Sequence, residues 1–157
     1  TTTAMIPHLN TREGLVVMTN SMRTAQEILS LEPAPTLLMT GGTWDTQTRS
    51  LQGQIAEQVL RSYDFDQLFI GCDGIDPARG TTTFNELTGL SKVMAESASE
   101  VIVVATTDKV GRRIPNLELP WSKINKLIID VSLPIDARRN IEQQGVEIII
   151  ATPNGEK

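Results

Sequence analysis

The sequence predicts an α/β fold in which helices flank a mostly parallel sheet, in three layers. Two observations support this class. Short apolar runs alternate along the chain with amphipathic runs of helical spacing, an order that parallel strands joined through helices produce. The apolar runs are hydrophobic at successive positions, as expected for strands covered on both faces. No internal repeat or linker divides the chain, so we expect one domain over residues 1–157.

Each apolar run is expected to be a strand, and the strands are placed near residues 15–18, 36–39, 68–71, 101–105, 126–129 and 146–150. Helices are expected between them, at about residues 22–31, 53–63, 87–97 and 134–144. Asn20 or Ser21 would cap the first of these helices, and Gly145 would end the last. Segments 46–51 and 119–121 are expected to be loops, and any helix within residues 1–9 to be short.

The composition limits the class of protein. The chain has 157 residues, a formal net charge of −5 and 4% aromatic residues. An acidic chain is unsuited to hold nucleic acid by itself, because that binding depends on clustered Lys and Arg. No run approaches the roughly 20 apolar residues that span a bilayer, and no secretory signal is present. With a lone cysteine, a cytoplasmic location is expected.

The sequence offers no support for a cofactor or a metal. Neither a Gly-x-Gly-x-x-Gly nor a Gly-x-x-x-x-Gly-Lys-Ser/Thr motif occurs, so no nucleotide cofactor is expected. His8 is the only histidine, which leaves no His-rich metal site. Cys72 is expected to be a small buried hydrophobe with no group to activate it.

One stretch concentrates polar side chains, residues 71–86, between an apolar strand and an amphipathic helix. It contains two aspartates, three glycines, three threonines and an asparagine. A structural turn does not need so many hydrogen-bonding groups. Because open α/β sheets bind ligands at the carboxyl ends of their strands, this stretch is the expected ligand loop.

Three further strand ends carry groups suited to an anionic ligand. Thr19-Asn20-Ser21 precedes a helix whose N-terminus attracts anions, although a helix cap alone also accounts for these residues. Gly41-Gly42 permits positive φ or close backbone approach. Lys109 follows another strand and could reach an anion over the sheet or be an ordinary solvated lysine.

Five motifs in this order and spacing resemble the C-terminal sensor domain of the DeoR family of bacterial sugar-operon repressors. They are Met18-Thr19-Asn20-Ser21, Thr40-Gly41-Gly42-Thr43, the run from Phe69 to Asp76, Gly80-Thr81-Thr82 and Lys109-Val110-Gly111. The resemblance covers essentially the whole chain. Gly-Thr-Thr-Thr-Phe-Asn-Glu after Asp-Gly-Ile-Asp looks most like the branch that regulates glucitol (sorbitol) operons.

The resemblance implies a fold like that of ribose-5-phosphate isomerase and the CoA transferases. It implies a phosphorylated sugar as effector, glucitol 6-phosphate or a related hexose phosphate, whose binding changes affinity for operator DNA. The DNA would be bound by an N-terminal winged helix-turn-helix outside this chain. Such repressors usually assemble as homodimers or homotetramers. The start at Thr1 suggests that a first strand and glycine precede this sequence.

The family pattern is carried over position by position. Thr1–Thr3 match the end of the first phosphate loop, and Asp73 and Asp76 match acids that face sugar hydroxyls. Lys109 matches a lysine that approaches the ligand, although the usual Ala-Asp-x-Ser-Lys reads here as Ala-Thr-Thr-Asp-Lys. The residues implied to bind ligand are Thr1, Thr2, Thr3, Thr19, Asn20, Ser21, Gly41, Gly42, Asp73, Gly74, Asp76, Thr82, Thr83, Asn85, Glu86, Lys92 and Lys109.

The isomerases that this chain resembles pose an alternative function. In them a glutamate base directly precedes a lysine at the start of the helix after the aspartate loop. If Lys92 is that lysine, Ser91 precedes it, and serine is no base at neutral pH. Glu86 keeps the enzyme alternative open. We expect a sensor with no catalytic residues, the alternatives being an isomerase-like enzyme and a module for oligomerisation alone.

Overall fold

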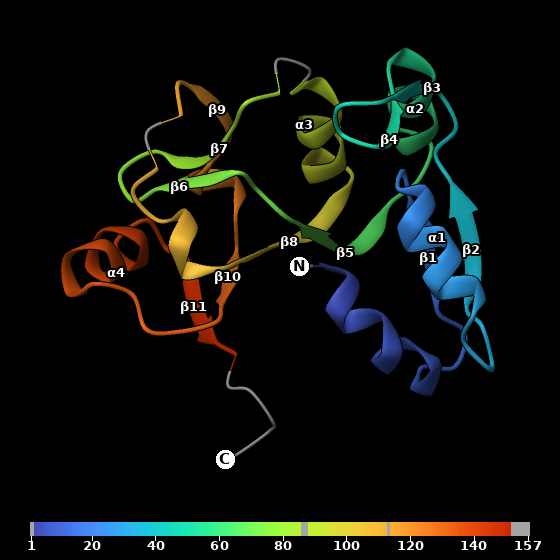
Figure 1. Cartoon of the computed structure of the whole chain (residues 1–157), viewed down its shortest axis with the longest axis horizontal. Coiled ribbons are helices and arrows are strands. Elements are labelled where there is room, and N and C mark those ends of the chain that lie inside the picture. The colour runs from blue at the N-terminus through green and yellow to red at the C-terminus, as the bar shows by residue number, and fades with distance from the viewer. Residues whose placement is uncertain (1, 86–87, 113, 152–157) are drawn as a thin grey trace. The chain divides into compact units, whose positions relative to one another are not determined.

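The computed structural model describes residues 2–85, 88–112 and 114–151. It contains two compact units, Thr2–Tyr63 and Asp64–Lys157. The α-helices and strands of both are labelled in Figure 1. Each unit combines helices and strands, so the chain is a mixed α/β protein.

A four-stranded parallel sheet forms the centre of the second unit. Its strands are β5 (Phe65–Ile70), β8 (Ala98–Ala105), β10 (Lys126–Ile129) and β11 (Glu147–Ile150), in the order β11-β10-β8-β5. All three pairings are parallel. Successive apolar residues let these strands bury side chains on both faces. Four of the expected strands are therefore confirmed in one parallel sheet.

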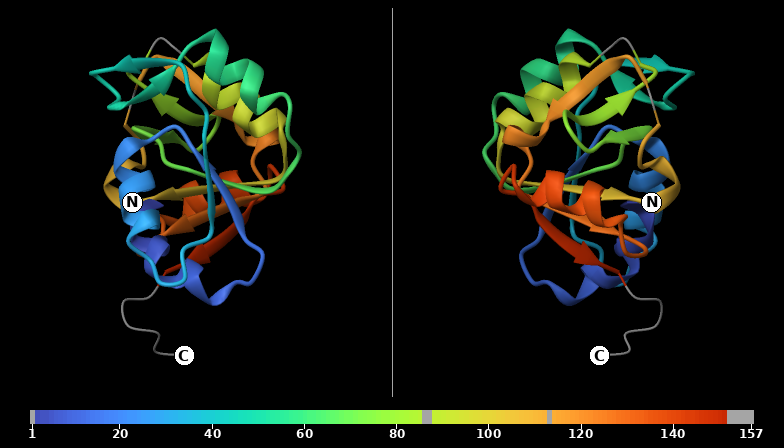
Figure 2. Two further views of the ribbon diagram at one scale, coloured as in Figure 1. Left: turned by 90° about the vertical axis from the view of Figure 1, so that its right-hand side faces the viewer. Right: turned by 90° about the vertical axis from the view of Figure 1, so that its left-hand side faces the viewer.

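Two helices of this unit provide apolar faces to its core. The first, α3 (Gly89–Glu96), buries Leu90 and Val93. The second, α4 (Ile135–Glu142), buries Ala137 and Ile141 and lies against β11 (Figure 2). Pro134 precedes α4 and Gly145 follows it with φ of 85°. These boundaries agree with the stop and start residues of the sequence.

A second, antiparallel sheet was not predicted. It consists of β6 (Gly74–Asp76), β7 (Gly80–Thr83) and β9 (Asn116–Pro120), with β7 in the middle. The prediction of a continuous ligand loop over 71–86 is therefore wrong for most of that stretch, and 119–121 is not simply a loop. The three threonines are β-branched and favour strands, and all three are buried in β7.

The two sheets of this unit share one hydrophobic core. Ile75, Leu119 and Trp121 come from the antiparallel sheet and its end, and Val103 and Leu127 from the parallel sheet. Two 3₁₀ turns, η2 (Thr107–Lys109) and η3 (Trp121–Lys123), connect the layers. Trp121 is buried as expected, and its indole N–H donates to the carbonyls of the β6–β7 turn. The core fixes the position of the carboxyl end of β5.

The first unit is smaller. Its elements are η1 (Thr2–Thr11), β1 (Val16–Thr19), α1 (Met22–Leu29), β2 (Thr36–Met39), β3 (Thr43–Asp45), β4 (Ser50–Gln52) and α2 (Gln54–Leu60). β1 and β2 pair in parallel, which confirms the two remaining expected strands. The segment predicted as a connector, 46–51, instead contains the turn and start of the β3–β4 hairpin. η1 passes through Pro7, so the expected short helix is longer than predicted.

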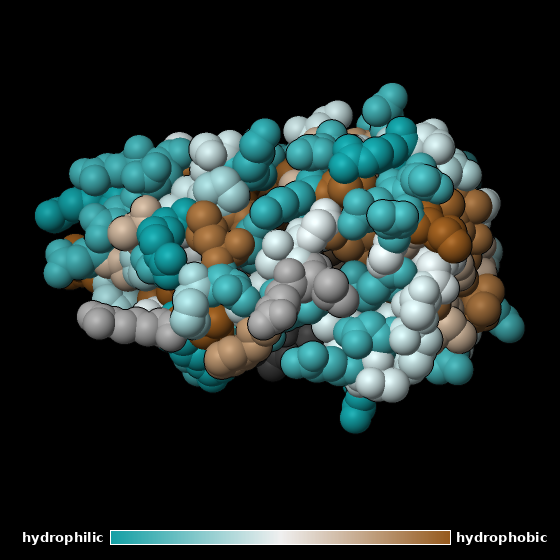
Figure 3. All heavy atoms as spheres, turned by 90° about the horizontal axis from the view of Figure 1, so that it is seen from above, coloured by the Kyte–Doolittle hydropathy of each residue, from teal (hydrophilic) through white to brown (hydrophobic). Residues whose placement is uncertain are grey.

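The surface is mixed in character. On the face drawn in Figure 3, hydrophilic side chains cover most of the area, and hydrophobic ones form small separate patches. Within the described ranges, no helix is long and apolar enough to cross a membrane.

Candidate functional site

The site begins at the carboxyl end of β5, where Asp73 meets the end of β7. The hydroxyl of Thr83 donates to Asp73 Oδ2 at 2.7 Å, and the backbone N–H of Phe84 donates to the same oxygen at 3.2 Å. The N–H of Asp73 in turn donates to the carbonyl of Thr82. Asp73 is exposed. The hairpin thus fixes a solvent-facing carboxylate, a group suited to accept hydrogen bonds from sugar hydroxyls.

Lys109 reaches the same strand end from η2. Its Nζ donates to the carbonyl oxygen of Cys72 at 2.6 Å. The backbone holds this approach, because Val110 bridges to Ile75 and the N–H of Gly111 donates to the Ile75 carbonyl. An ammonium group and the Asp73 carboxylate are therefore both anchored at the end of β5. Together they can bind a ligand that carries hydroxyls and a negative charge.

Cys72, between these two groups, is not a nucleophile. The residue is buried and its thiol is reduced. Burial raises the pKa of Cys72 to about 12, even though the charge of Lys109 acts in the opposite direction. A thiol with that pKa is almost entirely protonated at neutral pH, which confirms the prediction of a small buried hydrophobe.

Glu118 is a member of this cluster that sequence reasoning missed. Thr81 lies opposite Leu119 and Thr82 opposite Leu117, so Glu118 is the extra residue of a β-bulge in β9. A bulge changes the direction of a side chain, and here Glu118 and Leu119 are both buried although they are adjacent in sequence. An acidic residue between two leucines was the available signal.

Hydrogen bonds and burial act in opposite directions on the pKa of Glu118. The hydroxyl of Ser91 on α3 donates to Glu118 Oε1 at 2.7 Å. Burial raises the pKa of Glu118 to about 6, against the Ser91 and Thr81 hydrogen bonds, and the nearby Asp73 charge raises it further. The cluster thus joins an exposed carboxylate, Asp73, to a buried carboxyl group that ionises close to neutral pH.

The other residues of the hairpin have mainly structural roles here. Thr82 is fully buried, and its hydroxyl has no hydrogen-bond partner among the described residues. A Cβ on Gly74 would lie 2.6 Å from that hydroxyl, so the close pairing of β6 and β7 requires glycine. The N–H of Asn85 donates to the Thr83 hydroxyl at 3.0 Å. Ligand contact by Thr82, Thr83, Gly74 and Asn85 stays a prediction.

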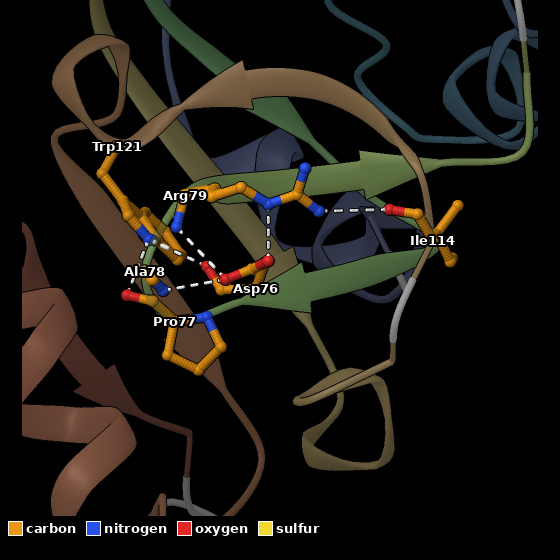
Figure 4. Close-up of polar contacts among 6 residues, drawn as sticks. All are labelled: Asp76, Pro77, Ala78, Arg79, Ile114 and Trp121. Carbon is orange, nitrogen blue, oxygen red and sulfur yellow. Dashed lines mark hydrogen bonds and ion pairs between the residues drawn. The ribbon is translucent and has the colours of Figure 1, made fainter.

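Asp76 lies at the opposite end of β6 from Asp73. Its Oδ2 accepts from Arg79 Nε at 2.6 Å and its Oδ1 from the N–H of Ala78 at 2.9 Å, while Arg79 also donates to the carbonyl of Ile114 (Figure 4). Although burial alone would raise it, these hydrogen bonds hold the pKa of Asp76 below its ordinary value. The structure does not bring the two predicted acids together, and a ligand at Asp76 would have to displace Arg79.

A pocket of about 460 Å³ lies beside this turn. Its lining residues are Asp76, Pro77, Arg79, Gly111, Arg112, Ile114 and Pro115. Arg112 is paired with Asp108, the aspartate directly before Lys109. Because both arginines already have acidic partners, the pocket has little excess charge with which to hold an anion.

The remaining predicted residues of this unit contribute less. Lys92 is exposed on α3, next to Ser91, which faces Glu118. Glu86 lies outside the described residues, as does Thr1. The described residues contain no group of three or more His, Cys, Asp or Glu side chains that could hold a metal.

In the first unit, the three predicted ligand residues after β1 have local structural partners. Ser21 is the N-cap of α1, its hydroxyl accepting from the N–H of Thr24 at 3.2 Å, so the cap interpretation is confirmed. The Thr19 hydroxyl accepts from the N–H of Ser21, and the Asn20 amide donates to the Leu51 carbonyl. These bonds order the end of β1 whether or not a ligand binds there.

The double glycine of this unit permits close packing. A Cβ on Gly42, at a φ of 107°, would lie 2.5 Å from the carbonyl oxygen of Gln52. Gly41 also has a positive φ, of 66°.

Thr2 and Thr3, predicted to receive a phosphate, are partly buried at the start of η1. Their ligand contacts, like those of Gly41 and Gly42, stay predictions.

The chain has a mixed α/β fold, and the cluster at the end of β5 brings a carboxylate and an ammonium group to one strand end. Comparison with known proteins gives its family. Residues 1–131 match the family described as the DeoR C terminal sensor domain. The chain belongs to this family.

Its relatives are transcriptional regulators. The chain is 38% identical over 152 residues to a putative aga operon transcriptional repressor of Escherichia coli O157:H7. The aligned region covers 96% of this chain and 56% of that relative. The chain is 34% identical to the HTH-type transcriptional regulator GlpR of Haloferax volcanii (95% and 58%) and 31% identical to the HTH-type transcriptional repressor GlcR of Bacillus subtilis (96% and 57%). The chain thus spans a little over half the length of these relatives. The expectation of a sensor domain rather than an enzyme is confirmed.

Proposed function

We propose that this chain is the effector-binding and oligomerisation part of a bacterial sugar-operon repressor. It binds a phosphorylated sugar, and binding changes the affinity of the whole repressor for operator DNA through a helix-turn-helix elsewhere in the protein. Membership of the DeoR sensor family supports this function. The anchoring of Asp73 and Lys109 at one strand end is the observation that carries it.

The chemistry of this strand end suits a sugar phosphate. Asp73 accepts hydrogen bonds from hydroxyls, while the Lys109 ammonium neutralises part of the phosphate charge. In the free protein Lys109 donates to the Cys72 carbonyl, so a ligand phosphate would compete with that bond. A ligand changes DNA binding only to the extent that it binds the two states of the repressor with different affinity.

Several finer points belong to the same proposal. The effector is glucitol 6-phosphate or a related hexose phosphate, and the operon serves glucitol utilisation. The chain acts as one sensing domain with the fold of ribose-5-phosphate isomerase, assembles as a homodimer or homotetramer, and works in the cytoplasm. Phosphate contacts by Thr1–Thr3 and by Ser21 belong to the same proposal.

Calorimetric titration tests the proposal. The chain is titrated with glucitol 6-phosphate, fructose 6-phosphate and ribose 5-phosphate, with inorganic phosphate as the control. Saturable binding of a hexose phosphate is expected. Turnover of ribose 5-phosphate would instead favour an isomerase, and assembly without any response would favour a pure oligomerisation module.

Lys109→Ala is expected to weaken sugar-phosphate binding by roughly 1.5–3 kcal/mol, because a hydrogen bond to a charged group is lost. This corresponds to roughly a tenfold to hundredfold change in the dissociation constant. Lys123→Ala, which removes an exposed lysine from η3, is the matched control. Equal affinity of the two variants would contradict the assigned role, provided that both retain the circular-dichroism spectrum of the unaltered chain.

A further inference from the structure

Glu118 is a buried acid that the proposed function leaves unexplained. It is 9% exposed and belongs to a sheet whose other buried polar residues are threonines. Burying a carboxylate is costly unless its oxygens receive hydrogen bonds, and a leucine or valine at this position would avoid that cost. The bulge in β9 nevertheless directs this side chain inward. Such bulges are typical near functional sites, where they change the direction of a side chain.

The groups that act on Glu118 lie on α3, on β7 and in the segment after β5. Ser91 of α3 donates to Oε1 at 2.7 Å, and the nearby hydroxyl of Thr81 on β7 also lowers the pKa of Glu118. The Thr81 hydroxyl also accepts from the N–H of Leu119, which ties it to the bulge. From the segment after β5, the carboxylate of Asp73 acts on Glu118, whereas the Cys72 thiol beside it is protonated and uncharged. Asp73 therefore adds negative charge near Glu118, while the positive charge of Lys109 is held at the Cys72 carbonyl.

An anion at the end of β5 would add to that negative charge. Asp73 links Glu118 to this strand end, because its N–H donates to the carbonyl of Thr82, which pairs with β9 beside Glu118, and its charge acts on Glu118. Lys109, which would receive the phosphate, is anchored on the carbonyl of Cys72 in the same segment. An added negative charge favours the protonated form of a nearby carboxyl group. By linkage, protonation of that group favours binding of the anion to the same extent.

We propose that Glu118 couples the sensor to pH: the anionic effector binds preferentially to the form in which Glu118 is protonated, so that binding takes up a proton from solvent. This inference rests on the proposed function, since it needs a negatively charged effector at the end of β5. The burial-raised pKa of Glu118, about 6, lies close enough to neutral pH for the coupling to operate. In this proposal Asp73 contacts the ligand directly, whereas Glu118 acts on it only through its charge.

The test compares affinity for fructose 6-phosphate and glucitol 6-phosphate in the unaltered chain and in Glu118→Gln, from pH 5.5 to 8. Phosphate monoesters have a second pKa near 6, but this ionisation is common to both chains and cancels in the ratio of their affinities. Above pH 7 the variant is expected to bind more tightly, by roughly threefold to tenfold. Near pH 5.5 the two affinities converge, because protonated Glu and Gln are both neutral and close in shape.

Two further variants distinguish the proposed coupling from a purely structural effect of Glu118→Gln. Ser91→Ala removes a donor that stabilises the carboxylate, so it should move the pH at which the affinity changes to a higher value. Glu142→Gln, on the exposed side of α4, is the matched control and should reproduce the unaltered profile. Calorimetry in two buffers of different ionisation enthalpy should show greater proton uptake by the unaltered chain than by Glu118→Gln at pH 7.

The outcomes separate this inference from the proposed function. Binding with a constant affinity ratio between pH 5.5 and 8, or with equal proton uptake, would overturn the coupling and leave the sugar-phosphate sensor intact. Failure of every sugar phosphate to bind any of the chains would overturn the proposed function and this inference with it. A ratio that changes with pH, together with the upward shift in Ser91→Ala, supports the coupling.

Discussion

Two buried groups beside Asp73, the thiol of Cys72 and the carboxyl of Glu118, both have a pKa above the ordinary value. In each residue burial is the largest cause, because an apolar environment disfavours the charged form. The consequences differ. The thiol is kept inert throughout the physiological range, while the carboxyl group changes charge within reach of it.

For Glu118 the raised pKa has a definite consequence for stability. The ordinary value is 4.5 and the folded value is about 6, so the folded state binds the proton more tightly than the unfolded state. The contribution of this raised pKa to the free energy of unfolding is fully present below pH 4.5 and is lost as the pH rises through 6. The shift of about 1.5 units corresponds to about 2 kcal/mol.

Glu118→Gln should remove this contribution, so the difference in free energy of unfolding between the variant and the unaltered chain should grow in favour of the variant between pH 4.5 and 6.5. Denaturant unfolding at a series of pH values measures it. Asp76, Glu100 and Asp130 have lowered pKa values and lose stability in acid, but they are common to both chains and cancel. A difference that is independent of pH would contradict the burial of this charge.

Cys72 should resist thiol reagents in the folded chain. With a pKa of about 12 the reactive thiolate is a tiny fraction of the thiol at pH 8, and the side chain is buried. Labelling with a chromogenic disulfide is expected to be at least a hundredfold slower, in order of magnitude, than in urea-unfolded chain. Rapid labelling without denaturant would show that the end of β5 opens readily.

Among the elements, the β6–β7–β9 sheet depends on a close backbone approach at Gly80. A Cβ on Gly80 would lie 2.1 Å from the carbonyl oxygen of Leu119, and Gly80 has a φ of 143°. Both features exclude a side chain at this position. The pairing of Gly80 with Pro120 sets the register that places Glu118 in the bulge.

Gly80→Ala is therefore expected to destabilise the chain by about 3 kcal/mol or more, since the clash is with backbone that cannot rotate away. Gly145→Ala is the matched control, because Gly145 also has a positive φ, of 85°, but no atom lies within 4 Å of the added Cβ. The control should cost about 1 kcal/mol, from the left-handed backbone alone. Thermal melting of both variants measures the contrast, and similar losses would refute the close approach.

For the molecule as a whole, net charge governs contact with nucleic acid. The chain carries a formal charge of −5. Non-specific DNA binding arises from cationic side chains that replace counterions on the phosphates. This chain by itself is consequently expected to bind operator-length duplex with a dissociation constant weaker than about 100 µM in 0.15 M salt.

Fluorescence anisotropy with a labelled duplex measures this affinity. Lowering the salt tenfold should leave the binding weak, because an acidic chain does not gain attraction as screening decreases. Micromolar binding by this chain would mean that the sensor part contacts DNA directly, and would require a cationic surface that the composition does not suggest.

Much of the fold was predictable from local pattern. The apolar runs predicted all four strands of the parallel sheet and the β1–β2 pair, because burial on both faces requires apolar residues at successive positions. Helical spacing together with residues such as Ser21 and Gly145 predicted α1 and α4. Asp73 and Lys109 were predicted as strand-end residues, and the structure places both at the end of β5.

The sequence by itself thus determined which segments are strands and helices of the α/β framework, because periodicity and caps act within a few residues along the chain. Only the tertiary structure decided that Gly80 pairs with Pro120 and that Glu118 is buried beside Ser91. Gly80 and Pro120 are 40 positions apart in the sequence, and Ser91 and Glu118 are 27 positions apart. A bulge exists only once two strands are in register, so no local pattern reveals that an acid between two leucines faces inward.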